Sequence, residues 1–96
     1  MNARDVGTEL LRSLVAVVDE ASYTKAALRL GISQPAVSSH VRKLAEHLGV
    51  EIFDKSTPGV KLTPHGETVL EHARKILRLH DNLVRDMERT GSEVPR

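Results

Sequence analysis

The chain has 96 residues, the length of one small domain, and 40% of them are hydrophobic and 28% charged. These fractions are ordinary for a soluble globular protein and argue against wholesale disorder. The formal net charge of +1 says little about partners, while the lack of cysteine excludes disulfides and cysteine zinc sites. No aliphatic run approaches the roughly 20 residues that span a bilayer, and no signal peptide is readable, so we expect a cytoplasmic module.

The first two predicted helices are separated by a very short connection. Leucine and valine recur at helical spacing over about residues 8–20, which predicts an amphipathic helix. Ser22 is a suitable N-cap for a second helix over about residues 23–30, and Gly31 is suited to end it.

A third helix is predicted over about residues 34–48, with Ser33 as its N-cap and Gly49 after its last turn. Its apolar residues form a single stripe that we expect to be buried, Val37, Val41, Leu44 and Leu48. The opposite face is small, polar and basic, and it contains Gln34, Pro35, Ser38, Ser39, Arg42 and Lys43. A face of this kind is shaped to enter a groove.

Two short strands, a turn and a long helix complete the predicted elements. Alternating apolar residues indicate strands at 50–56 and 60–63, joined by a Thr-Pro-Gly turn that Lys55 and Lys61 flank. A threonine followed by proline then begins a helix over 64–89, and a flexible tail is expected at 90–96.

Charge is unevenly distributed along the chain. No acidic residue lies between Glu20 and Glu46, although thirteen acids spread evenly would place several in a window of this length. The same window contains Lys25, Arg29, Arg42 and Lys43, together with His40. An acid-free, basic segment is typical of a surface that meets phosphates.

Two helices joined by a short turn containing glycine, the second polar and basic outward, predict a helix-turn-helix at about residues 23–42. The hairpin that follows makes it a winged one. The fold class is therefore mainly α: a three-helix core, a two-stranded wing at about 50–63, and a long C-terminal helix.

This arrangement predicts DNA binding, with the third helix in the major groove. Gln34 can pair with an adenine edge, and Arg42 can read guanine or bind phosphate. Lys55 and Lys61 would contact the backbone or the minor groove. Short hydroxyl donors for phosphates are offered by Ser22, Thr24, Ser33 and Ser38.

The last helix carries a stripe of apolar residues with the spacing of a two-helix coiled contact. Its predicted dimerisation residues are Val69, Ala73, Ile76, Leu77, His80, Leu83, Val84 and Met87. We expect part of the stripe to pack on the first helix and a second copy to cover the remainder. Because histidine is the residue type whose charge ordinarily changes between pH 5 and 8, a pH-sensitive pairing at His80 is an alternative to a hydrogen-bonded His80 at the rim of the contact.

Catalytic chemistry has little support in the sequence. The histidines lack the i, i+4 spacing of a helical zinc pair, and the glycine motifs of nucleotide-binding loops are absent. Ser38, Ser39 and His40 are adjacent on one helix and point apart, so they do not form a nucleophile and its base. We therefore expect no enzyme activity, no metal and no cofactor.

The stretch from residue 11 to residue 67 strongly resembles the N-terminal domain of LysR-type transcriptional regulators. Four segments carry the resemblance in the same order, S-Y-T-K-A-A-x-x-L from Ser22, S-Q-P-A-V-S from Ser33, L-G-V-x-I-F from Leu48 and L-T-P-H-G from Leu62. The resemblance implies a bacterial regulator that binds double-stranded DNA, with a partly dyad-symmetric operator. It also implies a homodimer paired through antiparallel linker helices, and a small-molecule effector bound by a further domain.

The resemblance divides the chain into a DNA-binding domain at 1–63, a linker and dimerisation helix at 64–89, and a tail at 90–96 toward the effector domain. It places DNA contacts at Thr24, Gln34, Pro35, Ser38, Ser39 and Arg42 and near Lys55 and Lys61. Three departures stand out: Ser39 and Lys55 where many members have arginine, and Ala45 where glutamate is common. Lysine at position 55 keeps the charge but loses the planar fork of arginine.

Two alternatives remain open from the sequence. The chain could be a dimerisation or protein-interaction module that uses the long helix and binds no DNA. It could also belong to another family of winged-helix regulators with the same architecture.

Overall fold

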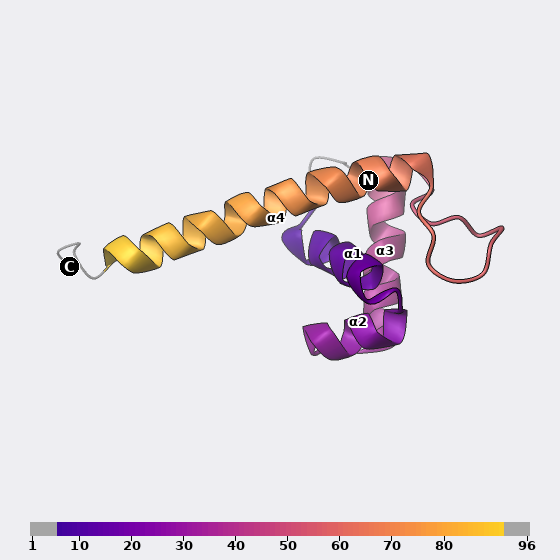
Figure 1. The fold of residues 1–96 in the computed structure, drawn as a ribbon, viewed down its shortest axis with the longest axis horizontal. Helices are drawn as coiled ribbons and strands as arrows, with labels where there is room; N and C mark the ends of the chain where they lie inside the picture. The colour runs from indigo at the N-terminus through magenta and orange to yellow at the C-terminus, as the bar shows by residue number, and fades with distance from the viewer. Residues whose placement is uncertain (1–5, 92–96) are drawn as a thin grey trace.

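The computed structural model describes residues 6–91, which form four helices and a long connection between the third and fourth. The helices are α1 (Thr8–Glu20), α2 (Tyr23–Leu30), α3 (Gln34–Leu48) and α4 (Pro64–Gly91). Figure 1 shows α4 running along one side of the other three helices and continuing well beyond them, while the connection loops out at the opposite end. None of the helices described is long and apolar enough to cross a membrane.

The short connections between the first three helices arise from their caps. Ala21 ends α1 in the left-handed conformation, with φ of 52°, and the next residue, Ser22, accepts a hydrogen bond from the Lys25 backbone N–H at 3.0 Å. Gly31 ends α2 at φ of 70°, a conformation that glycine adopts without the steric cost of a Cβ. The three helices predicted over 8–20, 23–30 and 34–48 are thus confirmed.

The core is aliphatic and centred on α1, which contacts each of the other helices. Its N-terminal half packs with the end of α3, with Ile52 and with α4, through Leu10, Leu11, Leu14, Leu44, Ala73 and Leu77. Its C-terminal half packs with α2 and the start of α3, through Ala16, Val17, Ala26, Ala27, Val37 and Val41. Ser13 lies between the two clusters, and its hydroxyl pairs with His40 Nδ1 at 2.7 Å, which ties α1 to α3.

Helix α4 is held against α1 by burial and by charge. Ala73 is fully buried and Leu77 nearly so. Beside them, the Arg74 guanidinium donates to Asp19 of α1 at 2.8 Å and, together with Arg29, holds the pKa of that carboxyl below its usual value. The first half of α4 is therefore a fixed part of the core.

Three predictions about the elements were wrong in detail. The two strands of the wing, residues 50–63, are reduced to one antiparallel bridge between Phe53 and Leu62, because a two-stranded hairpin without further strands is only marginally stable. Leu48, expected in the buried stripe, is 37% exposed in the last turn of α3. Helix α4 continues to Gly91, beyond the predicted end at 89, and the rest of the predicted tail lies outside the described residues.

Candidate nucleic-acid interface

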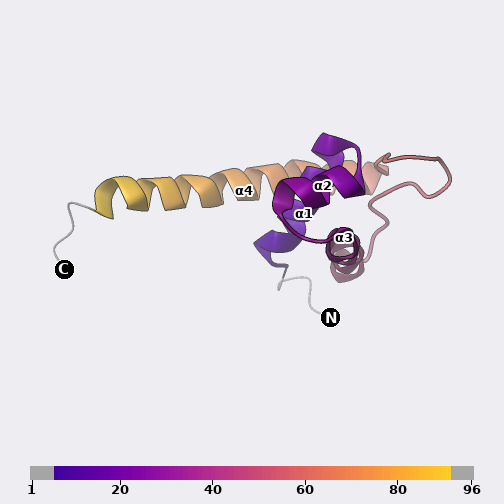
Figure 2. The same ribbon diagram turned by 90° about the horizontal axis from the view of Figure 1, so that it is seen from below.

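Helix α3 presents its polar face to solvent because its other face is anchored in the core. Val37, Val41 and Leu44 are buried against α1 and α2, which fixes the rotation of the helix about its axis. The Ser33 hydroxyl accepts from the Ala36 backbone N–H at 3.2 Å, and a proline in the first turn needs no intrahelical partner. Figure 2, which looks along α3, shows it at the surface of the three-helix core.

The residues predicted for this face lie on it together. Gln34, Pro35, Arg42 and Lys43 are exposed, and Ser38 and Ser39 are half-buried. The Gln34 side-chain amide donates to the Ser38 hydroxyl at 3.1 Å, one turn along the helix. This bond orients the amide along the outer face of α3, where it is available to a partner.

The contribution of α2 comes from its first turn. Thr24 and Lys25 are exposed there. Ser22 and Ser33, which were predicted as phosphate donors, both accept a backbone N–H to cap a helix, and each hydroxyl keeps its hydrogen for donation to a ligand.

The wing is held by turn and side-chain hydrogen bonds and has no regular strand ladder. Asp54 and Lys61 are joined by a backbone hydrogen bond of 2.8 Å, and Gly59 turns the chain at φ of 83°. The Asp54 carboxylate accepts from the Ser56 hydroxyl at 2.6 Å and from its backbone N–H at 2.9 Å. These bonds, with the charge of Lys61, lower the pKa of Asp54. Lys55 and Lys61 are both exposed.

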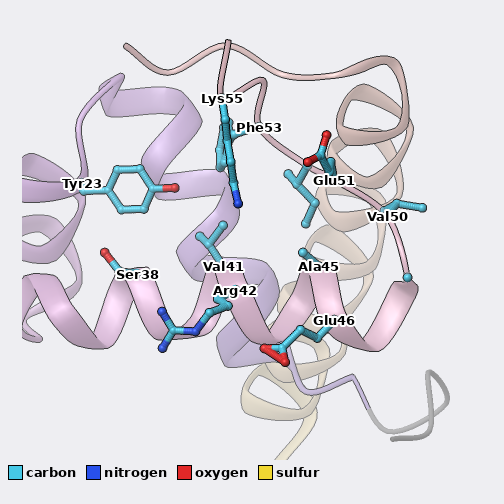
Figure 3. A pocket seen from close by; sticks show the side chains of 12 residues that line it. Tyr23, Ser38, Val41, Arg42, Ala45, Glu46, Val50, Glu51, Phe53 and Lys55 are labelled. Atoms are coloured by element: carbon cyan, nitrogen blue, oxygen red, sulfur yellow. The ribbon is translucent and has the colours of Figure 1, made fainter. Parts of the chain in front are cut away.

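A groove of about 540 Å³ separates α3 from the wing (Figure 3). Ser38 and Arg42 line it from α3, Phe53 and Lys55 line it from the wing, and Tyr23 enters it from the start of α2. Tyr23 and Phe53 make an edge-to-face contact, with ring centroids 6.1 Å apart. Partial burial raises the pKa of Tyr23, so its hydroxyl remains a protonated donor at neutral pH.

Tyr23 is a member of this site that the sequence reasoning missed. It was placed within the second helix and given no role. The sequence contained one signal for a role of Tyr23 in the site: it is the sole tyrosine of the chain, and it directly follows the capping residue Ser22.

Basic side chains fall into two groups by their partners. Five arginines and lysines on α1, α2 and α4 form ion pairs with carboxylates, Arg12, Arg29, Arg74, Lys75 and Arg89. Around α3 and the wing, by contrast, the cations of the described chain lack an ion pair: Lys25, Arg42, Lys43, Lys55 and Lys61. In the same described part of the chain, Arg78 and Arg85 on α4 also have no ion pair. The α3 and wing surface therefore offers several positive charges that form no ion pair within residues 6–91.

The predicted dimerisation residues divide between the core and the surface. Ala73 and Leu77 are buried in the chain's own core, and Val69 is half-buried. The exposed apolar side chains of α4 are Ile76, Leu79, Leu83, Val84 and Met87, which we call the α4 stripe. Leu79 is an addition to the sequence prediction. His80 is exposed, and its Nδ1 accepts from Arg12 at 3.2 Å, since a guanidinium can only donate.

A family of known proteins matches most of this architecture. The family described as "Bacterial regulatory helix-turn-helix protein, lysR family" matches residues 8–67, from the start of α1 to the first turn of α4. The chain belongs to the LysR family. Its fold is the winged helix-turn-helix with a linker helix, as predicted.

Several LysR-family regulators are similar to the chain. It is 48% identical over 71 residues to the regulator BudR of Klebsiella aerogenes, covering 74% of this chain and 50% of BudR. It is 40% identical over 82 residues to the regulator BenM of Acinetobacter baylyi, covering 85% of this chain and 27% of BenM. The chain thus spans half or less of the length of these relatives.

Solved structures of the same family share the fold. A crystal structure of the BenM DNA-binding domain in complex with benA site 1 DNA has a TM-score of 0.82 and 38% identity, and the match covers 90% of this chain and 97% of that one. The full-length BenM R156H mutant has a TM-score of 0.79 at 38% identity, covering 86% of this chain and 27% of that one. The solved structures that are similar to this chain therefore include a LysR-family domain in complex with DNA.

A metal site has no geometric support in the region that is described. Within residues 6–91, no three histidine or acidic side chains come together in a way that could hold a metal ion.

Proposed function

We propose that this chain is the DNA-binding part of a LysR-type transcriptional regulator and that it binds double-stranded DNA sequence-specifically. The observation that carries the proposal is the α3 and wing surface, where exposed hydrogen-bonding groups lie among cations without internal ion pairs. The total charge of +1 conceals this surface, because most other cations of the described chain are neutralised by carboxylates. The DNA-bound BenM domain, which is similar over nine-tenths of the chain, supports the same function.

In the proposed complex, α3 lies in the major groove with its first turns against the base edges. The oriented Gln34 amide can pair with adenine, and Arg42, two turns later, can reach guanine or a phosphate. The wing lysines contact the backbone or the minor groove next to it. A chain with this role acts on the nucleoid in the cytoplasm, and it needs no catalytic residue.

Removing the charge of Lys61 is expected to weaken binding to all DNA sequences alike. A phosphate contact releases condensed counterions, so the slope of log K against log salt should fall in Lys61→Ala by about one unit for each bound copy. Fluorescence anisotropy over a series of salt concentrations measures this slope. Arg85→Ala, which removes the same charge from the far half of α4, should leave the slope unchanged, and equal slopes in all three proteins would contradict the role of Lys61.

We further propose that two copies pair through the α4 stripe. Leu83 is 59% exposed and Leu79 68% exposed, which is unusual for leucines that share one face of a helix. The stripe begins at Ile76, which also lines a groove of about 350 Å³ bounded by α1, α3 and α4. In the proposed dimer, α4 of a second copy lies against the α4 stripe and removes its apolar side chains from water.

Shortening one side chain of the stripe is expected to weaken this pairing while the fold stays intact. Leu83→Ala removes apolar contact area twice in a symmetric dimer, so the dissociation constant should rise about tenfold or more. Sedimentation equilibrium measures it. Arg85→Ala lies on the opposite side of the same turn and serves as the control, and a dimer that tolerates both changes equally would refute the proposed contact.

The function itself is tested with a pool of random duplex DNA. We expect the chain to bind the pool at low salt, to release it steeply as salt rises, and to enrich a dyad-symmetric site after rounds of selection. A folded, dimeric chain that binds no duplex at low salt would instead support the alternative of a protein-interaction module. Enrichment of a site without symmetry would support the proposal of DNA binding and contradict the proposal of a symmetric dimer.

A further inference from the structure

The groove between α3 and the wing gathers hydrogen-bond donors from three separate elements. The Tyr23 hydroxyl comes from the start of α2, the Ser38 hydroxyl and the Arg42 guanidinium from α3, and the Lys55 ammonium from the wing. Figure 3 shows the Tyr23 hydroxyl and the Lys55 ammonium both pointing into the space above α3. Residues this far apart in the sequence converge because the wing folds back beside α2.

The Tyr23 ring is held by packing, whereas its hydroxyl has no hydrogen-bond partner among the described residues. The ring is half-buried and packs edge-to-face on Phe53, and within the described chain no hydrogen bond reaches its oxygen. Arg42 and Lys55, which line the same groove, are exposed and have no ion pair in the region that the structure describes. The groove is therefore lined by three donors to which the described residues offer no acceptor.

The two ends of the groove differ in charge. Glu46 and Glu51 line the end near the start of the wing, while Tyr23, Ser38 and Lys55 lie toward the start of α3 (Figure 3). An anion is repelled from the first end and attracted to the second. The groove therefore has one position that suits an anion.

We propose that this position, formed by Tyr23, Ser38, Arg42 and Lys55, binds a backbone phosphate of the DNA duplex, and that the Tyr23 hydroxyl donates to it. The inference rests on the proposed function. If α3 lies in the major groove and the wing lies in the adjacent minor groove, the sugar-phosphate strand that separates the two grooves must pass between α3 and the wing. The groove is the space through which that strand runs, and its donors face the strand.

Tyr23→Phe tests the contact with the least disturbance, because it keeps the ring and its packing on Phe53. A hydrogen bond to a charged group contributes enough that its loss should raise the dissociation constant about tenfold. Since a phosphate contact carries no sequence information, the loss should be the same for the specific site and for random duplex. Because the hydroxyl is neutral, the salt dependence should not change, whereas Lys55→Ala should reduce the slope by about one unit for each bound copy.

A second measurement identifies the phosphate. In dyad-symmetric operator duplexes with pairs of neutral methylphosphonate replacements at symmetry-related positions, one pair should abolish the difference between the parent chain and Tyr23→Phe. Urea unfolding of both proteins checks that stability is unchanged. If Tyr23→Phe binds as tightly as the parent, or if no such pair abolishes the difference, the phosphate site is wrong while DNA binding stands. If the parent itself binds no duplex, both this inference and the proposed function fail.

Discussion

Replacing Gly66 by alanine is expected to destabilise the fold by about 3 kcal/mol or more, although alanine favours helices by roughly 1 kcal/mol over glycine. Gly66 is buried in the first turn of α4, and a Cβ there would lie 2.1 Å from the Ile52 carbonyl oxygen and 2.9 Å from its carbon. Neither atom belongs to a flexible side chain. The clash must therefore move backbone.

The surroundings leave little room for that movement. The Ile52 carbonyl accepts the Thr63 backbone N–H at 2.9 Å, and the Ile52 side chain is buried in the core. Thr63 in turn accepts the Gly66 N–H at 2.9 Å through its hydroxyl. Relief of the clash breaks at least part of this junction between the wing and α4, so the cost of overpacking exceeds the gain in helix propensity.

Urea unfolding at a fixed protein concentration measures the change in the free energy of unfolding. His65→Ala is the matched control, because His65 is exposed in the same helical turn and should change stability by less than about 0.5 kcal/mol. A Gly66→Ala variant that is as stable as the parent would show that α4 can shift away from Ile52 without loss.

Replacing Gln34 by alanine is expected to cost about 1 to 3 kcal/mol of binding free energy at a selected operator and much less on random duplex. Gln34 is exposed in the first turn of α3, and its amide is oriented by the bond to Ser38. Because that bond uses only one amide hydrogen, the amide retains a donor and an acceptor for the edge of one base.

Competition anisotropy with the selected site and with random duplex gives the specificity ratio in a single experiment. The ratio should fall for Gln34→Ala and stay constant for Lys61→Ala, which provides a phosphate-contact control on the same surface. An equal loss on both duplexes in Gln34→Ala would assign Gln34 to the backbone rather than to a base.

The helices could be predicted from the sequence because local signals agree with the tertiary packing. Ser22 and Ser33 cap helices as expected, Gly31 and Gly49 end them, and the apolar stripe of α3 is buried over Val37, Val41 and Leu44. Leu48 departs from that stripe because it lies in the last turn, at the edge of the packed core.

The wing was less predictable. Alternating apolar residues predict strands, but a two-stranded hairpin is only marginally stable by itself, and within residues 6–91 the pairing is limited to the Phe53–Leu62 bridge. Side-chain hydrogen bonds, such as those from Ser56 to Asp54, shape the connection instead.

The chemistry of the groove could not be read from the sequence because its parts are remote in the chain. Tyr23 and Lys55 are brought to one groove only by the way the wing returns beside α2. Likewise, the pattern of the last helix could not separate the residues that pack on α1 from those left exposed. That division depends on where α4 crosses the core, which sets Ala73 and Leu77 inward.

The docking of α4 on α1 also determines how motion would travel through the molecule. Twenty-eight residues at about 1.5 Å each make α4 roughly 42 Å long, and its contacts with α1 extend from Ala73 to the Arg12–Asp81 pair. The buried residues Ala73 and Leu77 and the Arg74–Asp19 pair join this part of the helix to the core. A small rotation of the core is therefore carried along α4 and becomes a displacement of several ångströms at its far end.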